Sequence, residues 1–492
     1  MISVDQAREI VISQSKAHAG ALSTVRLPLS HALGHILAQE ILTDREYPPF
    51  DRSTRDGYAV RASEATPGAK LRCTNEIKAG DFVSEALPPD ACVQIMTGAA
   101  VPPSADAVVM IEFTSRASDI VTFDRPTQPG QNIVPRGSEA RANQVALPAG
   151  IRLGFAELAI AAQVGAATVS CYQRPSVAIL SSGDEVVPVT ETPGPFHIRN
   201  SNSVSIAAQV EIAGATPVSL GNAADRVEDL SGKIELGLQH PILVLSGGVS
   251  MGKYDLVESV LKGFGAEFFF DAVAMRPGRP TVFGRCRNTL VFGLPGNPVS
   301  TMVTFRLFVT PAIDILAGAS PRPLPLLEAT LAAAISEKAR LTHFLPAHLE
   351  WSLLAPQVTA LTWQGSGDIS ALLRANCFLV VPADRLEIPA GERVSVLPRS
   401  DVLYTDQWPN CPITPATAKS LWSTFPRRRS PPGPPLPTPL CACPPPSSAP
   451  SAPSKIQRAI PWKSLVLPAL PRPNEPPNGY LFVIRFQLPT LM

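Results

Sequence analysis

Small and acidic residues follow an apolar segment at a point where they could bind an anion or a metal. Asp184 and Glu185 come soon after the apolar run 176–180, and packing poorly explains an acidic pair there. Ser182 and Gly183 stand in the same loop. One such pair could also belong to an ordinary solvent-facing loop. This loop is therefore a candidate ligand site only if other loops of the chain provide matching residues.

A glycine-rich loop follows a second apolar run, 241–245. Gly247 and Gly248 would let backbone N–H groups approach a phosphate, while Ser246 and Ser250 add hydroxyl donors. The spacing fits the first seven positions of an ATP-binding P-loop, but Tyr254 stands where that motif needs a Mg²⁺-binding Ser or Thr. We therefore expect a phosphate-binding loop and not an ATPase site.

Two arginines and a second Pro-Gly loop favour an anionic ligand. Arg276 and Arg279 lie three residues apart in a Pro-Gly turn, where an anion would relieve their mutual repulsion. The other loop precedes a predicted helix that starts at Ser300. A structural role is the alternative for this loop, because proline suits a helix start, but helix amino ends also bind anions. Its residues are Pro295, Gly296, Asn297 and Pro298.

Further polar residues stand in the first third of the chain. Asp51 and Asp56 lie in a loop that ends in an Asp-Gly turn signal, and Thr97 follows an apolar strand pattern. Arg136 precedes a glycine, where its guanidinium could face an oxyanion. Taken alone, the Asp51 and Asp56 loop is better explained as a turn, and the Thr97 segment as an ordinary strand-to-loop transition.

Hydrophobic periodicity indicates how these loops are positioned. Apolar runs at 176–180, 217–220, 241–245 and 267–271 alternate with helical patterns at 204–213, 226–238 and 256–264. This alternation predicts βαβ units and a doubly wound parallel sheet over 174–320, whose ligands bind beyond the carboxyl ends of the strands.

The flanking segments predict further domains, since 492 residues exceed what one hydrophobic core supports. Helical patterns over 2–45, with a second helix around 32–41, and at 155–162 predict a segmented helical linker domain made of 1–46 and 146–173. Short β-branched runs predict an inserted β domain over 47–145 and a small C-terminal β domain over 321–400.

Composition separates the last segment from the rest. Residues 401–492 hold 22 of the 53 prolines, with nine basic and three acidic residues, whereas 1–400 hold 33 basic and 38 acidic ones. A mildly acidic body argues against nucleic-acid binding. We expect a disordered tail, no membrane span, no secretory signal and a cytoplasmic location.

The loops together predict one kind of site. Three glycine-rich loops, two arginines and several carboxylates would gather at the ligand edge of an α/β sheet. Residues of these types bind a phosphorylated or nucleotide-bearing anion together with a divalent metal held by oxygen ligands.

Six motifs in order make this chain resemble the molybdopterin molybdenumtransferase family, which includes the bacterial relatives of the gephyrin E domain. They stand at 50–60, 95–99, 182–185, 246–252, 276–280 and 293–300, and the resemblance covers about residues 1–400. It implies a multidomain α/β plus β fold with a molybdopterin-binding α/β domain, and an elongated homodimer whose active cleft combines the α/β domain of one subunit with the β domain of the other.

The resemblance also implies an activity, the last step of molybdenum cofactor synthesis. Molybdenum from molybdate enters adenylylated molybdopterin with Mg²⁺, and AMP is released. The cleft residues implied for catalysis are Asp56, Thr97, Glu185, Asp225 and Asp255, of which Asp56, Glu185 and Asp255 would bind metal. Arg136, Arg276 and Arg279 would hold molybdate or phosphate oxygens, and Pro295 and Pro298 would shape the pterin loop.

The resemblance leaves two alternatives and some departures. A molybdopterin adenylyltransferase shares the α/β domain, and a gephyrin-like scaffold would bind a partner without turnover. The implied protein partners are the adenylyltransferase and downstream molybdoenzymes. Arg276 and Arg279 stand where the family often has lysine, and Glu139 stands where aspartate is usual.

Overall fold

The computed structural model describes residues 1–492 except 82–83, 249–255, 338–339, 352–354, 400 and 402–492. The predicted disordered tail therefore lies outside the described residues, as do Ser250 and Asp255. Everything described below belongs to one compact unit, Met1–Cys411.

The N-terminal segment begins with the predicted helix but continues differently. Helix α1 (Val4–His18) starts at Ser3, whose side chain accepts from the Gln6 amide in a capping box, and buries Ala7 and Val11. The helix predicted around 32–41 is wrong. The chain there forms short pairings, because Gly34 adopts a left-handed conformation with φ of 77° that ends any helix.

The linker domain is consequently a mixture of helix and strand. Strand β1 (Thr24–Pro28) pairs antiparallel with β12 (Thr168–Tyr172), and β2 (Ile41–Leu42) pairs with β11 (Val145–Leu147). Between them lie η1 (Leu29–His31) and α2 (Phe155–Gln163), the second of which was predicted. Segments from either side of the inserted domain thus pair with each other, as the segmented organisation requires.

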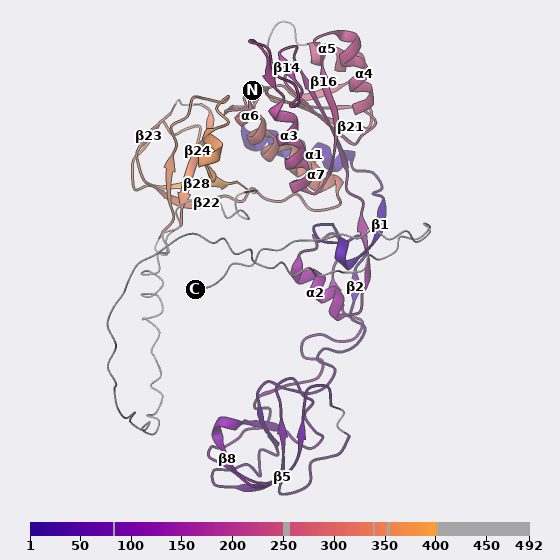
Figure 1. Ribbon diagram of the computed structural model, residues 1–492, viewed down its shortest axis with the longest axis vertical. Helices are drawn as coiled ribbons and strands as arrows, with labels where there is room; N and C mark the ends of the chain where they lie inside the picture. The colour runs from indigo at the N-terminus through magenta and orange to yellow at the C-terminus, as the bar shows by residue number, and fades with distance from the viewer. Residues whose placement is uncertain (82–83, 249–255, 338–339, 352–354, 400, 402–492) are drawn as a thin grey trace, which may run out of the picture. The chain divides into compact units, whose positions relative to one another are not determined.

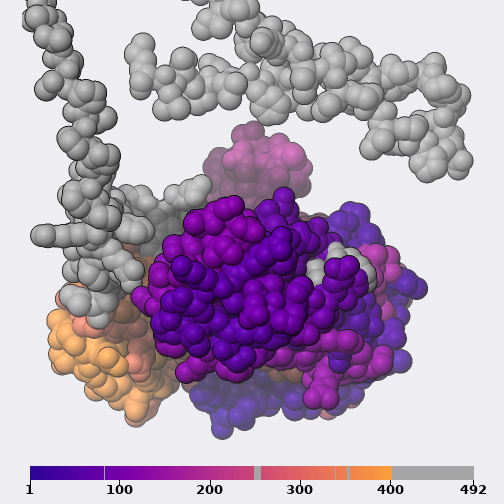
Figure 2. Space-filling view, turned by 90° about the horizontal axis from the view of Figure 1, so that it is seen from below, coloured from indigo at the N-terminus to yellow at the C-terminus, as the bar shows by residue number. Residues whose placement is uncertain are grey.

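The inserted domain is all β, as predicted. Its six-stranded sheet runs in the order β7 (Ala107–Met110), β4 (Gly57–Val60), β6 (Ala91–Ile95), β5 (Lys70–Ile77), β9 (Ile120–Phe123) and β8 (Thr114–Ala117). β3 (Arg52–Ser53) pairs separately with β10 (Ile133–Val134), and η2 (Ile111–Phe113) follows β7. Figure 2 shows the outer face of this domain, in indigo and purple, as a closely packed surface.

The α/β domain holds a six-stranded sheet that is parallel only in part. Its order is β16 (Thr216–Ala223), β13 (Ser176–Ser182), β17 (Ile242–Ser246), β21 (Thr289–Leu294), β20 (Val282–Cys286) and β18 (Glu267–Phe270). The first four strands are parallel. The strand predicted at 267–271 exists, but it joins the edge antiparallel to β20, which itself runs antiparallel to β21. β18 therefore runs in the same direction as β17, as the predicted crossover through the helix at 256–263 requires, and β20, which was not predicted, is the strand of this described sheet that runs the opposite way.

Helices cover both faces of this sheet (Figure 1). α4 (Val227–Gly237) and α5 (Leu256–Gly263) pack on one face. α1 and α3 (Ser201–Ala213) pack on the other. That second face also carries one continuous helical stretch made of α6 (Pro298–Thr304), the π-helical turn η3 (Phe305–Val309) and α7 (Thr310–Leu316). Alternate strand residues such as Ile179 and Leu180 enter the two different cores, which is what a doubly wound sheet requires.

The C-terminal domain is the predicted second β module. Strands β24 (Thr342–Glu350), β25 (Gln357–Ala360), β22 (Leu327–Leu331), β28 (Arg393–Pro398) and β26 (Cys377–Val381) pair in that order, and β26 pairs back to β24, so the sheet closes on itself. β19 (Met275–Arg276) of the α/β domain joins its edge at β24. The remaining short elements are β14 (Val186–Val187), β15 (Ile198–Arg199), β23 (Ile335–Ser336), β27 (Glu387–Ile388) and α8 (Ala371–Arg374).

Candidate active site

The predicted loops meet at the carboxyl edge of the four parallel strands. β13 ends at Ser182, which pairs in register with Ala223 at the end of β16. Ser246 at the end of β17 is level with Leu294 at the end of β21. Because these strands are neighbours and point the same way, the segments that follow them emerge together.

The glycines of the β17 loop permit very close packing at this edge. Gly247 and Gly248 have φ of 88° and 63°, which side-chain-bearing residues rarely adopt. A Cβ on Gly247 would lie 2.7 Å from the Ser182 carbonyl oxygen, and one on Gly248 would lie 2.5 Å from the Ser182 hydroxyl oxygen. The loop therefore requires glycine at both positions to lie against β13.

Besides the Asn222 side-chain carbonyl oxygen near the end of β16, two buried polar atoms at this edge have no protein partner in the described part of the chain. They are the Ser182 hydroxyl oxygen and the Asn202 side-chain carbonyl oxygen. A buried unpaired hydrogen-bonding group is unfavourable unless a ligand or water satisfies it. Both atoms therefore mark places where a bound molecule would form hydrogen bonds.

Asn202 is a site residue that sequence reasoning missed. From the first turn of α3, its side-chain amide donates to the Ser246 hydroxyl at 2.8 Å and to the Gly296 carbonyl at 2.7 Å. It thus ties the β17 loop to the Pro-Gly loop after β21. An asparagine beside the helix-capping Asn200 reads from sequence as part of an ordinary cap, so only the three-dimensional contact identifies it.

The Pro-Gly loop is also held from the C-terminal domain. The Asn297 side chain donates to the Ser366 hydroxyl at 2.9 Å, and the Val299 amide donates to the Ser366 carbonyl at 3.1 Å. Pro298 starts α6, two residues before the predicted start. Ser366 lies in a glycine-rich segment, 364–368, that was a usable but overlooked signal.

The acidic residues lie at the β13 and β16 ends of the edge. The Asp225 amide donates to the Asp184 carboxylate at 3.0 Å, which joins the two loops. The Glu185 carboxylate lies so close to Gly183 that a Cβ there would be 2.6 Å from it. Asp255, the other predicted acidic residue, lies outside the described residues.

Arg276 and Arg279 remain available as cations. Both side chains are exposed, and neither guanidinium donates a hydrogen bond or forms an ion pair within the described residues. Their turn packs against α6, since a Cβ on Gly278 would lie 2.5 Å from a Thr304 methyl carbon. The helix that begins at the Pro-Gly loop therefore also supports the arginine turn.

A separate group of predicted residues lies in the inserted domain. The Asp56 carboxylate accepts from the Thr97 amide at 2.6 Å and from its hydroxyl at 2.8 Å, and these bonds, the amide's first, lower the pKa of Asp56. The Arg136 amide donates to Asp51 at 2.7 Å, while its guanidinium donates to Glu46. Within the described residues, no hydrogen bond or ion pair joins this group to the strand-edge group.

Comparison with known proteins identifies the family. Residues 2–165 match a family model described as "MoeA N-terminal region (domain I and II)", residues 178–314 a "probable molybdopterin binding domain", and residues 328–398 a "MoeA C-terminal region (domain IV)". The molybdopterin molybdenumtransferase of Bacillus subtilis is 34% identical over 383 residues, which are 75% of this chain and 88% of that protein. This chain belongs to the molybdopterin molybdenumtransferase family.

Other relatives agree with this assignment. The molybdopterin molybdenumtransferase of Haemophilus influenzae is 33% identical over 407 residues, which cover 82% of this chain and all of that protein. Two crystal structures of molybdopterin biosynthesis MoeA proteins from Pyrococcus horikoshii match at 28% and 26% identity with TM-scores of 0.64 and 0.69, and 81% of this chain is covered in both. The predicted family and the multidomain α/β plus β fold are confirmed.

The family resemblance implies Mg²⁺, and the acidic residues can be tested for it. Among the described residues no three Asp, Glu, His or Cys side chains gather as a metal cage. Mg²⁺ usually binds through one or two carboxylates together with substrate phosphates and water. The linked Asp184 and Asp225 loops and the adjacent Glu185 provide oxygen donors of that kind, so the donor set fits.

One helical stretch in the described residues is long and apolar enough to cross a membrane. It is Pro298–Leu316, and 83% of its most apolar window is buried inside the protein. It also carries the loop and turn contacts described above. It therefore behaves as the core helix of the α/β domain.

Proposed function

We propose that this chain inserts molybdenum from molybdate into adenylylated molybdopterin and releases AMP. The observation that carries the proposal is the meeting of the Gly247 loop and the Gly296 loop at one strand edge, joined by Asn202. Curated relatives over most of the chain are named molybdopterin molybdenumtransferase, which supports the assignment.

The strand-edge loops would bind molybdopterin and its phosphate. Amides of Gly247 and Gly248 can approach a phosphate closely because neither residue has a side chain. The unpaired Ser182 hydroxyl would hydrogen-bond to the same ligand. Ser246, Ser250, Pro295 and Pro298 would complete the loops around it.

The free arginines would gather molybdate. Arg276 and Arg279 carry charges that no described carboxylate neutralises, and a planar guanidinium donates two parallel hydrogen bonds to an oxyanion. Arg136 would contribute the same chemistry after exchanging its bond to Glu46 for the substrate.

The carboxylates would hold Mg²⁺ and position the reacting groups. Glu185 and Asp255 would bind the ion, with Asp56 from the inserted domain, and Asp225 would support the chemistry beside them. When bound, Mg²⁺ supplies charge stabilisation at the adenylyl phosphate oxygens. The lowered pKa of Asp56 keeps its carboxylate ionised, as either role requires.

A homodimer would bring the two groups of residues together. If each active site combines the strand edge of one subunit with the inserted domain of the other, two different inactive variants should complement each other. We expect a mixture of Asp56→Asn and Gly248→Val chains, unfolded and refolded together, to recover part of the activity. Activity no higher than that of each variant alone would contradict a shared site, and light scattering should give twice the 52.3 kDa of one chain.

The decisive experiment measures AMP. In tungstate-free buffer with Mg²⁺, the purified protein should release AMP from adenylylated molybdopterin when molybdate is added. A reaction without molybdate is the control. ATP-dependent formation of the adenylylated compound by this chain alone would favour the adenylyltransferase alternative. That alternative leaves the matched regions 2–165 and 328–398 without a purpose.

Truncation separates the enzyme from the scaffold alternative. The family matches end at residue 398, so a chain that stops after Asp401 should restore nitrate reductase in a deficient host as well as the full chain does. Failure of both chains, or of the truncated chain alone, would contradict the plain enzyme. We further propose a cytoplasmic location, with the adenylyltransferase and molybdoenzymes as protein partners.

A further inference from the structure

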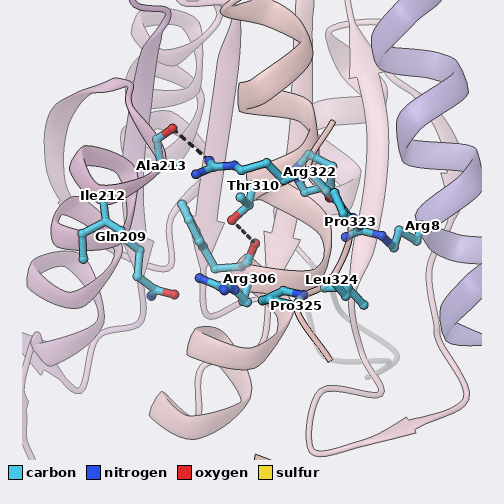
Figure 3. Close-up of a pocket in the computed structure, with 12 residues that line it drawn as sticks. Arg8, Gln209, Ile212, Ala213, Arg306, Thr310, Arg322, Pro323, Leu324 and Pro325 are labelled. Atoms are coloured by element: carbon cyan, nitrogen blue, oxygen red, sulfur yellow. Dashed lines mark hydrogen bonds between the residues drawn. The ribbon is translucent and has the colours of Figure 1, made fainter. Parts of the chain in front are cut away.

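A cavity of about 330 Å³ lies between α3, η3 and the segment that follows α7 (Figure 3). Three arginines line it from three different elements: Arg8 of α1, Arg306 of η3 and Arg322. Its volume is in the range of small-molecule sites. The candidate active site uses none of these residues.

The fully buried carboxylate near these arginines, that of Asp314, already forms ion pairs with Arg152 and Arg322. Asp314 accepts from Arg152 at 3.0 Å and from the Arg322 guanidinium at 2.8 and 2.9 Å, and the Arg322 amide adds a bond of 3.1 Å. Arg8 donates to the backbone carbonyls of Leu307 and Arg322. Arg8, Arg152 and Arg322 therefore all have hydrogen-bond partners within the protein.

Arg306 is different, because it is a half-buried cation that forms neither a hydrogen bond nor an ion pair through its side chain within the described residues. Burial lowers its pKa, and the charges of Arg322 and Arg8 add to the effect, while the carboxylates of Asp401 and Asp314 oppose it. The Asp401 carboxylate is itself paired with Arg399. A desolvated charge in this state is unfavourable until an anion reaches it.

Apart from Gln209 and Thr310, the other side chains that line the cavity are apolar. Phe305, Ile212 and Leu324 contribute to its walls, and a second hollow of about 230 Å³ that shares Arg306 and Ile212 extends toward Leu372. Figure 3 shows the Arg306 guanidinium directed to the side where Gln209 and Ile212 stand. An occupant would therefore need a charged head and an apolar body.

The backbone around Arg306 is also unusual. Arg306 lies in a π-helical turn between two α-helical segments. Such turns are rare overall, and those that occur are often found at functional sites. The tail of this chain is a poor candidate occupant, since residues 401–492 carry nine basic and three acidic residues. Like charges would repel.

We propose that this arginine pocket, lined by Arg8, Arg306 and Arg322, binds a small organic anion. Its carboxylate or phosphate accepts hydrogen bonds from Arg306, and its apolar part packs against Phe305 and Ile212. The site is separate from the proposed molybdenum chemistry and does not depend on it.

Calorimetric titration of the full chain tests the proposal with four probes: phenyl phosphate, benzoate, inorganic phosphate and benzyl alcohol. At least one of phenyl phosphate and benzoate should bind. The stronger of the two, which identifies the head group, should bind more tightly than inorganic phosphate and benzyl alcohol. Arg306→Gln should weaken that binding at least about tenfold, because one charge-assisted contact is lost. An Arg276→Gln, Arg279→Gln double variant should retain it, which separates this pocket from the candidate active site.

Several results would overturn the proposal. They are an affinity of Arg306→Gln for the better probe equal to that of the unchanged chain, binding of benzyl alcohol or of inorganic phosphate as tight as that of the better probe, or no binding of any probe. Thermal unfolding of the variant should match or exceed that of the unchanged chain, since Arg306 has no described partner to lose. If Arg306→Gln does not fold, Arg306→Lys keeps the charge but not the planar fork, so its affinity for the better probe should fall below that of the unchanged chain, and equal affinity would overturn the proposal.

Discussion

Replacing Asn202 with alanine should weaken substrate binding without slowing the chemical step. The substitution removes two hydrogen bonds, one to the part-buried Ser246 hydroxyl and one to the more exposed Gly296 carbonyl. A neutral hydrogen bond contributes about 1 kcal/mol, and water can replace the exposed one, so the loss is about 1–2 kcal/mol. This corresponds to a roughly five- to thirtyfold loss of kcat/KM.

The loss should fall mainly on KM. Asn202 holds two loops together both before and during the reaction, so its removal weakens ground state and transition state alike. The assay is steady-state AMP release against the concentration of adenylylated molybdopterin. Asn202→Asp should be worse than Asn202→Ala, because a carboxylate cannot donate to the Gly296 carbonyl and would face it with a negative charge.

The control is Asn75→Ala, the same chemical change at an exposed residue of the inserted domain. It should leave kcat and KM unchanged. If Asn202→Ala keeps its unfolding temperature and its kcat/KM stays within twofold of the unchanged chain, the loops do not need this link and the reasoning fails.

Three further predictions rest on other contacts. Asp56→Asn should lower kcat roughly 100-fold with unchanged molybdopterin binding. The lowered pKa keeps Asp56 ionised as pH falls, so the Asp56-dependent part of kcat should be lost only in acid. Thr97→Val removes one hydrogen-bond donor to Asp56, so the loss should begin at a higher pH in that variant than in the unchanged chain. Coincident pH profiles of the two chains would count against this role. Asp314→Asn should cost about 3 kcal/mol of unfolding free energy in urea titrations, since it leaves two arginines uncompensated, and a loss below about 1 kcal/mol would show that solvent screens them. Cys92 and Cys377, whose pKa burial raises to about 12, should resist a thiol reagent at pH 8 until the chain unfolds, and rapid labelling of the folded chain would contradict that burial.

The position of the strand-edge loops could be predicted from the sequence, because the local residue pattern there agrees with the fold. The runs that became β13, β17 and β21 are apolar and followed by glycine or proline, so the sheet edge and its glycine loops could be placed from pattern alone. The failures are also physical. The segment around Gly34 has helix-like spacing, but its pairing with residues 151–172 is a tertiary contact that no local pattern contains.

The same limit explains the residues that were missed. Asn202 and Ser366 act through side-chain contacts between segments 44 to 94 positions apart in the sequence. Single-sequence periodicity records burial along one element, and it holds no information on which distant loop a polar side chain reaches. Strand β20, which runs antiparallel to both of its neighbours, was missed because Gly284 and Arg285 interrupt its apolar run.

Helices α3 and α6 have one end at the strand-edge loops, and the helical stretches that contain them reach the arginine pocket. Asn202 opens α3 and Gln209 lines the pocket, while Pro298 opens α6 and Arg306 follows eight positions later. At 1.5 Å per residue these spans are only about 10–12 Å. If a ligand at one end shifts such a helix, thermodynamic linkage demands reciprocity: any factor by which the organic anion changes molybdopterin affinity is the factor by which molybdopterin changes affinity for the anion.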